Sequence, residues 1–392
     1  MRLQVQEISV ISGVLLILCV NIILICYQLM IKSTPCFPGN DCHYYAVMTQ
    51  AFITHQNITV VFPFNQRILL PFLVSLLPFH SISTSYSVIN WVSINIALVM
   101  LIVVWARLKV PQLLIVWGLL WMLFNRAGIP FFFRDVVNTD VLGYVFNAVL
   151  IWIIIKRNYY YLILLAPLAV LQRESFLVSL FIIVIVEMVR FFDKKEKMPL
   201  VLSIFALILG IGANHLTNSG FFYPGEGSSL STVFVWLKTR FEHPIMLLQW
   251  LCAIAMVVGG LPMLLKYFSR FTAKDTALMN LLLISLSFLG FGLVAGTDVT
   301  RIIFDGIPFI ITACFYIAAQ SMIDVRVIAR VYLLSAFMLC LEYSLPLWVE
   351  YLTHQRQIYV YTLSIGFAYI LTARLLRLKN QQALHQKVSY KN

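Results

Sequence analysis

The chain has 392 residues, of which 61% are hydrophobic and only 11% are charged. Soluble globular proteins carry about 25% charged residues, so the composition excludes that class and indicates an integral membrane protein. In a soluble protein, the net charge of +12 would suggest a nucleic-acid partner. In a membrane protein, Lys and Arg concentrate in short cytoplasmic loops, and we expect no nucleic-acid partner.

Apolar segments recur along the whole chain, with lengths close to those needed to cross a hydrocarbon core about 30 Å thick. The first is too long for a signal-peptide core and lacks a small-residue cleavage site, so we predict a retained helix there. The pattern predicts an all-α polytopic membrane protein with about 12 transmembrane helices. These predicted spans lie at 8–30, 85–104, 110–125, 139–155, 159–171, 175–190, 199–215, 244–265, 277–295, 301–320, 328–346 and 357–375.

The distribution of Lys and Arg predicts the orientation of these spans. If residues 66–80 lie on the membrane surface without crossing it, every cluster of basic residues falls on one side, which the positive-inside rule makes cytoplasmic. We therefore expect a multi-pass protein of the plasma (inner) membrane with both termini in the cytoplasm. A single transmembrane domain would cover residues 1–376, followed by a basic cytoplasmic tail at 377–392.

Two of the predicted outer loops are long. The first, at 31–84, holds two apolar, aromatic-rich parts that are too short to span and are typical of interfacial helices. It also holds Cys36 and Cys42, whose spacing permits a disulfide in an oxidising compartment without requiring one. The second, at 216–243, has glycines between 220 and 227, which predict a mobile loop over the membrane face.

Charged side chains at the outer ends of the predicted helices are the candidate functional groups, because charge at membrane depth is costly. Carboxylates and guanidiniums on one face suit a site that holds an anionic headgroup and moves a proton. The set comprises Asp41, Arg67, Arg134, Asp135, Asp140, Arg173, Glu174, Asp298, Arg301 and Asp305.

The first outer loop supplies three of the candidate residues. The carboxylate of Asp41 could act as a general base toward an acceptor hydroxyl, while Asp before an apolar run is also a good N-cap. Arg67 could bind a phosphate bidentately or anchor its helix at the interface. His43, close to Asp41, is the one histidine with a candidate role.

Arg134, Asp135 and Asp140 surround the start of the span predicted at 139–155. Acidic residues in a first turn suit the positive end of the helix dipole, which accounts for both carboxylates without function. Asp140 nevertheless falls within the predicted membrane boundary, where a mere dipole partner is less expected, and this favours a functional role.

The other candidates come from two later outer turns. Arg173 and Glu174 join two predicted spans and could form an internal ion pair, or Arg173 could reach a ligand. Arg301 and Asp305 are spaced i, i+4 and could pair on one helix face, with Asp298 as the cap of that helix. Three charges within eight residues exceed what capping requires, so we favour contact of Arg301 with a ligand or lipid phosphate.

The chain has no His-x-x-x-His spacing, Gly-x-Gly-x-x-Gly motif, P-loop or Gly-x-Ser-x-Gly motif. We therefore expect neither nucleotide-driven chemistry nor a nucleotide-sugar binding domain. No cofactor is required by the pattern, and a divalent metal is optional.

Four short motifs resemble those of the GT-C superfamily of integral-membrane glycosyltransferases, in particular bacterial GT-C-like envelope proteins. So does the order of one span, an outer loop with an early Asp, two interfacial helices and many further spans. Asn40 stands where the family carries the first acid of a paired-acid motif. The motifs are Asp41-x-x-Tyr44-Tyr45, Pro63-Phe64-x-x-Arg67-x-Leu69-x-Pro71, Thr139-Asp140 and Gly296-Thr297-Asp298-x-x-Arg301.

This resemblance implies transfer of a sugar from a polyprenyl-phosphate donor to an extracytoplasmic acceptor, with inversion at the anomeric carbon. It implies that Asp41 is the catalytic acid of the first loop, acting as general base, and that His43 and Tyr44 lie at the substrate. Arg301 and Arg67 would hold the donor phosphate. The expected partners are the lipid-linked donor and membrane lipids, while the oligomeric state stays open. The alternatives are a transporter or flippase of a lipid-linked saccharide and an envelope polysaccharide polymerase.

Overall fold

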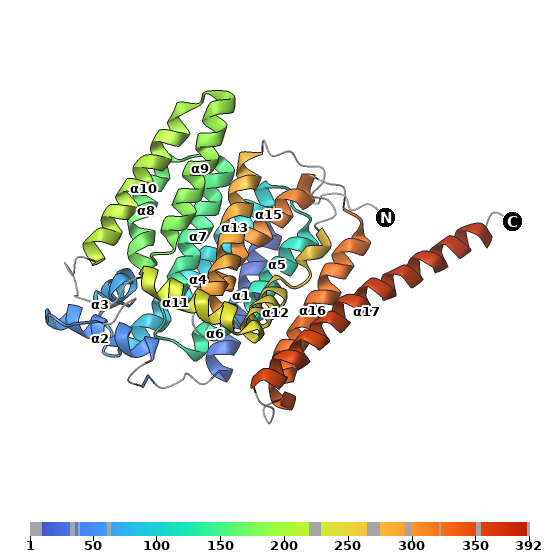
Figure 1. Ribbon diagram of the computed structural model, residues 1–392, viewed down its shortest axis with the longest axis horizontal. Helices are drawn as coiled ribbons and strands as arrows, with labels where there is room; N and C mark the ends of the chain where they lie inside the picture. Colours follow the sequence, from blue (N-terminus) through green and yellow to red (C-terminus); the bar gives the residue numbers. More distant parts are fainter. Residues whose placement is uncertain are drawn as a thin grey trace.

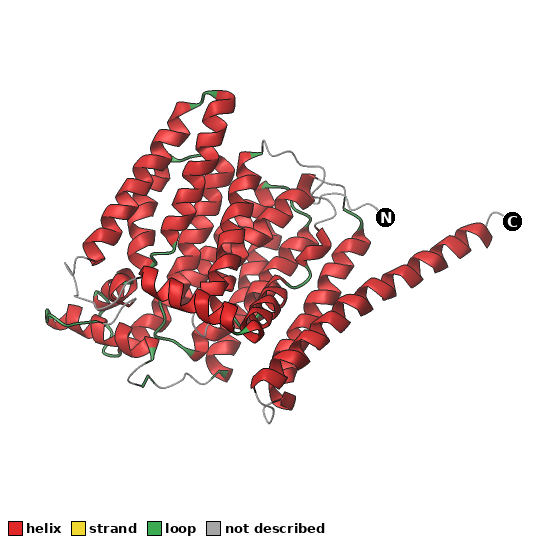
Figure 2. Ribbon diagram, viewed as in Figure 1, coloured by secondary structure: helices red, strands yellow, loops and turns green. Residues whose placement is uncertain are grey.

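The computed structural model describes residues 10–31, 36–37, 40–60, 64–218, 229–264, 275–294, 299–320, 323–349 and 354–389. Throughout these ranges the elements are helices, with no strand (Figures 1 and 2). The prediction of an all-α protein is therefore confirmed at the level of fold class.

The helices pack side by side in a bundle in which helices distant in the sequence are neighbours, as α4 and α7 or α9 and α13 are (Figure 1). The first half of the chain forms α1 (Val10–Met30), α2 (Asp41–Thr54), the short 3-10 helix η1 (Phe64–Gln66), α3 (Leu69–Ser75), α4 (Ile82–Arg107), α5 (Gln112–Phe124), α6 (Ile129–Arg134), α7 (Asp140–Lys156) and α8 (Tyr160–Gln172). The second half forms α9 (Phe176–Lys194), α10 (Lys197–Asn218), α11 (Ser229–Glu242), α12 (Pro244–Val258), α13 (Thr276–Val294), α14 (Val299–Asp305), α15 (Ile307–Gln320), α16 (Val325–Val349) and α17 (His354–Ser389).

Within the described ranges, five helical segments are long and apolar enough to cross a membrane. The count rises to seven if each of two bent helix pairs forms one span; the bend is 106° between α11 and α12 and 47° between α14 and α15. The candidates are Ser12–Met30, Ile82–Arg107, Gln112–Arg134, Lys197–Thr217 and Thr276–Val294. The structure therefore has the helical, multi-pass character that the composition predicts.

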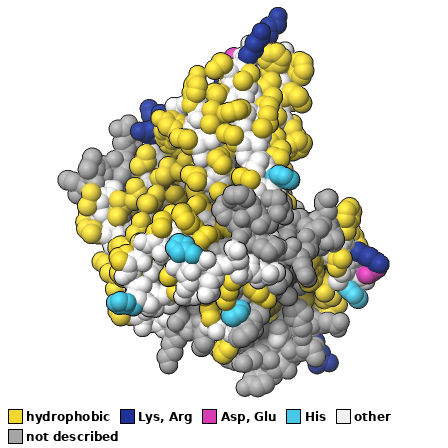
Figure 3. Space-filling view, turned by 90° about the vertical axis from the view of Figure 1, so that its left-hand side faces the viewer, with side chains coloured by type: hydrophobic (Ala, Val, Ile, Leu, Met, Phe, Trp, Pro, Cys, Tyr) yellow, Lys and Arg dark blue, Asp and Glu magenta, His cyan; other side chains and the backbone are white. Residues whose placement is uncertain are grey.

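The exterior of the bundle carries many exposed apolar side chains. Figure 3 shows a largely hydrophobic surface over the helices at the left of Figure 1, with Lys or Arg side chains at its far tip. Apolar surface of this extent marks contact with lipid or with another protein. On α9 and α10 the exposed side chains include Phe181, Val189, Phe192, Val201, Phe205, Ile208 and Ile211.

Both short helices expected within residues 31–84, the predicted first outer loop, are present. They are α2, with 14 residues, and α3, with 7, and both are too short to span. The helix expected over 66–80 is shorter than predicted, because it forms only at Leu69–Ser75. α3 packs against α2, α4 and α8, and both short helices lie at one end of the bundle (Figure 1).

The structure adds a detail to three of the predicted elements. The span expected at 301–320 is broken at Gly306 into α14 and α15, because Pro308 lacks the amide proton that would continue α14. The loop expected at 216–243 contains helix α11, while its glycine-rich segment lies outside the described residues. The expected tail at 377–392 is helical as far as Ser389, because α17 continues through it.

Candidate functional site

Asp41 is the first residue of α2, and its side chain faces another helix. Asn40 occupies the N-cap position, so the interpretation of Asp41 as a cap is wrong. The Asp41 carboxylate instead accepts a hydrogen bond from Nη2 of Arg301 on α14, at 3.0 Å. The Asp41 side chain is 31% exposed, whereas that of Arg301 is 10% exposed. One face of the carboxylate therefore stays accessible while the other is held by a guanidinium.

Arg301 bridges two carboxylates that come from different helices. Its Nε atom lies 3.1 Å from Oδ2 of Asp140, and its guanidinium carbon lies 5.2 Å from the centre of the Phe131 ring. The interpretation of Arg301 and Asp305 as an i, i+4 pair is wrong, because Asp305 pairs with Arg173 instead. The ion pairs of Arg301 thus join α14 to α2 and to α7.

Arg173 forms a second bridge at the C-terminal end of α8. Its guanidinium lies 3.1 Å from Oδ1 of Asp140 and forms a close ion pair with Asp305. The α8 helix ends here in an extended conformation, which directs the Arg173 and Glu174 side chains to different partners. The expected internal pair of these neighbours is wrong for that reason. Arg173 thereby ties α8 to α7 and α14.

Asp140, the first residue of α7, lies at the centre of this network. Its side chain is only 2% exposed, and both Arg173 and Arg301 lie within ion-pair distance. A buried carboxylate is costly unless it is paired, so two guanidiniums at this position compensate its loss of hydration. Asp41, Arg301, Asp140, Arg173 and Asp305 therefore form one continuous chain of ion pairs.

Arg67 and Glu174 form a separate ion pair beside that network. Nη2 and Nε of Arg67 donate to the two carboxylate oxygens of Glu174 at 3.0 and 3.3 Å. Burial alone would raise the pKa of Glu174, but the Arg67 charge and its hydrogen bonds hold that pKa below its ordinary value. The pair links the first outer loop to the α8–α9 turn.

Tyr45 completes the environment of Arg67. Its hydroxyl accepts a hydrogen bond from Nη1 of Arg67 at 3.3 Å, and its side chain is buried. Tyr44, the neighbour predicted for the site, instead stacks on Phe64 with ring centres 4.7 Å apart, and the His43 ring contacts Tyr44. The spacing of Asp41 and Tyr45, i and i+4 on one helix, could have identified Tyr45.

Asp135 lies in the turn between α6 and α7, outside the chain of ion pairs. Burial raises the pKa of its carboxyl to about 6, although a hydrogen bond from Asn138 at 3.2 Å and the nearby Arg301 charge both lower it. Burial therefore outweighs both of these effects on the Asp135 carboxyl. Asp298 lies outside the described residues.

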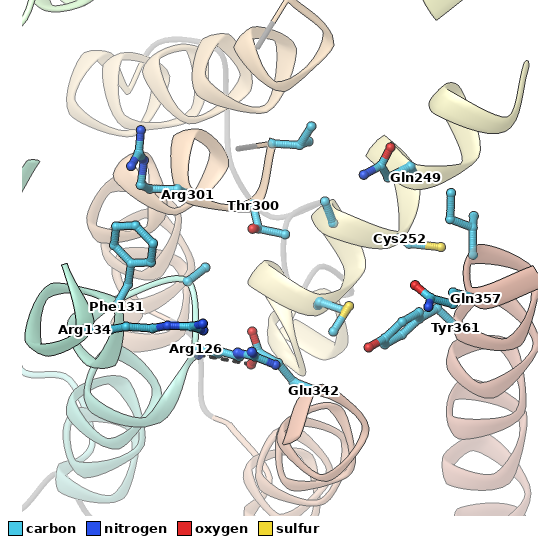
Figure 4. A pocket seen from close by; sticks show the side chains of 15 residues that line it. Arg126, Phe131, Arg134, Gln249, Cys252, Thr300, Arg301, Glu342, Gln357 and Tyr361 are labelled. Carbon is cyan, nitrogen blue, oxygen red and sulfur yellow. Dashed lines mark hydrogen bonds between the residues drawn. The ribbon is translucent and has the colours of Figure 1, made fainter. Parts of the chain in front are cut away.

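A cavity of about 390 Å³ adjoins Arg301 (Figure 4). It is bordered by α6, α12, α14, α16 and α17 and combines arginines, one glutamate, amides and apolar side chains. Its size falls within the range of small-molecule sites. The residues labelled in Figure 4 are Arg126, Phe131, Arg134, Gln249, Cys252, Thr300, Arg301, Glu342, Gln357 and Tyr361.

The sequence analysis missed two charged residues of this cavity. Arg126 lies two residues after the end of α5, and Glu342 lies in α16 with 7% of its surface exposed. The Glu342 carboxylate accepts a hydrogen bond from the backbone N–H of Arg126 at 3.1 Å. Both residues could have been recognised from the sequence, because each is a charged residue inside or beside a predicted apolar span.

Arg134 is the predicted site residue that lies most openly in the cavity. Arg126 and Arg134 are both exposed, and within the described part of the chain neither forms a salt bridge. Figure 4 shows both side chains at the cavity, with that of Arg126 beside Glu342. The cavity therefore holds two cationic groups available to an anion.

Cys36 and Cys42 form a disulfide, with Cα atoms 5.7 Å apart. This separation is in the ordinary range for a disulfide. The bond fixes the chain one residue beyond Asp41. Among the described residues, no group of three or more His, Cys, Asp or Glu side chains is arranged to hold a metal ion.

Comparison with known proteins found no matching protein family, no matching curated protein and no matching solved structure.

Proposed function

We propose that the protein is a membrane glycosyltransferase that moves a sugar from a polyprenyl-phosphate donor to an acceptor hydroxyl outside the cytoplasm. The observation that carries this proposal is the ion pair between Asp41 and Arg301. It places a partly exposed carboxylate next to the one residue of the ion-pair network that also lines the cavity. A base and an anion-binding cavity then lie on opposite sides of a single guanidinium.

The proposed reaction needs one proton transfer and one displacement. Asp41 takes the proton of the acceptor hydroxyl as its oxygen bonds to the anomeric carbon. The bond from that carbon to the phosphate oxygen breaks, and the polyprenyl phosphate leaves with both electrons of that bond. Its phosphate changes from a diester with one negative charge to a monoester with two. The residues near the cavity therefore act by stabilising the charge that develops on the leaving phosphate.

Asp41 suits the role of base better than the other carboxylates of the network. Asp140 and Asp305 are nearly inaccessible and are each held by Arg173, whereas Asp41 is nearly one third exposed. A general base must approach its hydroxyl to within about 3 Å. Asp140 and Arg173 then serve to position Arg301 and, through it, Asp41.

The proposed orientation places this site outside the cytoplasm. It retains the predicted arrangement of twelve spans in the plasma membrane with both termini cytoplasmic. A cysteine-labelling experiment on intact cells tests this arrangement with His80→Cys, near the first outer loop, and Lys194→Cys, at the end of α9. A membrane-impermeant maleimide should label only the first; labelling of the second would contradict the orientation.

The transferase proposal is tested with purified protein in lipid nanodiscs. Synthetic short-chain polyprenyl-phosphate hexoses and pentoses serve as donors, and release of polyprenyl phosphate is measured. Asp41→Asn should lower the rate by about 10²–10⁴-fold, the usual contribution of a general base. Asp193→Asn, at the far end of α9, is the matched control. Thermal unfolding shows whether each variant is folded.

Three outcomes separate the proposed function from its alternatives. No release from any donor by the folded wild-type protein would reject the transferase. Undiminished release by Asp41→Asn would reject Asp41 as the base. Movement of a lipid-linked sugar across a proteoliposome membrane without release would instead identify a flippase.

A further inference from the structure

We propose that Arg126 and Arg134 form a binding subsite for a dianionic phosphate monoester carried on an isoprenoid lipid. The two residues flank helix α6, with Arg126 three residues before its start and Arg134 as its last residue. Their side chains converge on one wall of the cavity (Figure 4). The subsite is therefore built on a short, well-packed element whose Ile129, Phe132 and Phe133 side chains are buried.

The charges on the cavity wall favour an anion. Arg126 and Arg134 are both exposed there, and neither forms a salt bridge within the described part of the chain. Glu342 is the carboxylate on the cavity wall; it accepts a hydrogen bond from the backbone N–H of Arg126 and interacts electrostatically with the Arg126 side chain. Arginine pairs bind phosphate through charge-assisted, often bidentate hydrogen bonds, so a bound phosphate would supply the counter-charge that one carboxylate alone does not supply.

Arg301 and Arg67, the residues that the sequence suggested for the phosphate, are already engaged. Arg301 lies within ion-pair distance of both Asp41 and Asp140, and Arg67 is held bidentately by Glu174. Binding a phosphate there would require breaking existing ion pairs. Arg126 and Arg134 form no salt bridge within the described part of the chain, and they bring two positive charges to a cavity wall that carries one carboxylate, Glu342.

The remaining cavity wall favours a lipid-linked phosphate. α12 and α17 contribute the apolar side chains of Ala253, Met256 and Ile358, which can contact an isoprenoid chain. Gln249 and Gln357 supply amide groups that can contact a polar substituent. A wall of this mixed character suits a ligand with an anionic head and an apolar chain.

This subsite deepens the proposed function, and its place in catalysis rests on that function. In the proposed transfer, the leaving phosphate gains a negative charge as its bond to the sugar breaks. Two guanidiniums stabilise the dianion more than the monoanionic donor, so they would act most strongly late in the reaction. Binding of the dianion itself does not depend on any transfer.

The test is a binding measurement on the full-length protein in lipid nanodiscs. Farnesyl phosphate is the probe at pH 8, where its phosphate is a dianion, and inorganic phosphate and farnesol are compared with it. Farnesyl phosphate should bind at least about tenfold more tightly than either fragment. Arg126→Gln and Arg134→Gln should each weaken it by about tenfold or more, as loss of a charge-assisted contact predicts.

Arg356→Gln is the matched control, because Arg356 is exposed next to the cavity residue Gln357 on α17 but does not line the cavity. It removes the same charge and should leave the affinity unchanged. Equal affinity of wild type and both cavity variants would overturn the subsite. Inorganic phosphate binding as tightly as farnesyl phosphate would overturn the assignment to a lipid-linked ligand.

The binding result and the transferase result are distinguishable. If farnesyl phosphate binds through Arg126 and Arg134 while no donor sugar is released, the subsite stands and the transferase is rejected. If sugar is released at the wild-type rate by the Arg126→Gln and Arg134→Gln variants and farnesyl phosphate affinity is unchanged in both, the transferase stands and the subsite is rejected.

Discussion

Arg301 of α14 donates a hydrogen bond to Asp41 of α2 across 260 residues of sequence, with 3.0 Å between Nη2 and Oδ2. This contact joins α2 to α14, in the second half of the bundle. It also joins the exposed carboxylate of the site to the cavity that Arg301 lines. The same guanidinium reaches Asp140, so the position of Asp41 depends on the ion pairs behind it.

A double-mutant cycle on Asp41 and Arg301 should measure this coupling. Because Asp41 is partly exposed, we expect a coupling free energy of about 1 kcal/mol from the variants Asp41→Asn, Arg301→Gln and the double variant. Arg301→Gln alone should cost more, because it also removes a partner of the buried Asp140. Urea unfolding in detergent micelles provides the free energies. Strict additivity of the two single variants would show that the contact contributes nothing.

Arg173→Gln should be among the most destabilising substitutions of the site. The substitution would remove the cation that pairs with the buried carboxylate of Asp305 and with one oxygen of the buried Asp140 carboxylate. Breaking a buried ion pair from one side costs about 3–5 kcal/mol, because the remaining charge stays desolvated. The measurement is the unfolding free energy in detergent at pH 7.5.

A second substitution provides the control for Arg173. Adding Asp305→Asn to Arg173→Gln removes one of the stranded charges and should recover part of the lost stability. A double variant less stable than Arg173→Gln would contradict this explanation of the network.

Glu174→Gln should lower stability in a pH-dependent way. Arg67 lowers the pKa of Glu174 in the folded protein. The ionised carboxylate therefore adds to the free energy of unfolding above the unfolded-state pKa of about 4.3, and this stabilisation is lost as the pH falls through the pKa of the folded protein. We expect the variant to be less stable than wild type by about 1–2 kcal/mol at pH 7, with the difference shrinking below about pH 4. Thermal unfolding followed across pH measures it.

The exposed pair of Lys238 and Glu242 provides a matched control for that experiment. Its atoms lie 3.7 Å apart on the surface of α11, and solvent screens such pairs. Glu242→Gln should leave the unfolding temperature unchanged across the same pH range. If the difference in unfolding temperature between wild type and Glu174→Gln grows as the pH is lowered, the pKa of Glu174 is not lowered in the folded protein.

Gly260→Ala should disturb a close backbone contact between the turn that follows α12 and helix α16. A Cβ atom at Gly260 would lie 2.7 Å from the Cα atom of Val331 on α16. Because backbone atoms cannot move aside, we expect a loss of about 1–3 kcal/mol in the unfolding free energy. Gly366→Ala is the control, since a Cβ there meets nothing within 4 Å. Removing a glycine from a helix stabilises it by up to about 1 kcal/mol. Equal effects of the two substitutions would contradict the close approach.

Much of the fold could be predicted because membrane helices are local in sequence. The length and hydrophobicity of each apolar run indicate a helix without reference to the rest of the chain. For this reason α4, α7, α8 and α13 begin and end within a few residues of the predicted limits. The break between α14 and α15 was missed because a Gly and a Pro within an apolar run are also tolerated in continuous membrane helices. The number and orientation of the spans stay predictions.

The sequence by itself indicated that a set of charged residues lies at or near the ends of helices: Asp41, Arg67, Asp140, Arg173, Glu174, Arg301 and Asp305. Which carboxylate pairs with which guanidinium depends on which helices are neighbours. The apolar surface of a single helix does not identify its neighbours, so the pairs become known only from the tertiary structure. Only the structure therefore joined Arg301 to Asp41 and Asp140, Arg173 to Asp305, and Arg67 to Glu174. It alone brought Arg126 and Arg134 into one cavity, because residues at either end of a short helix converge only when neighbouring helices enclose them.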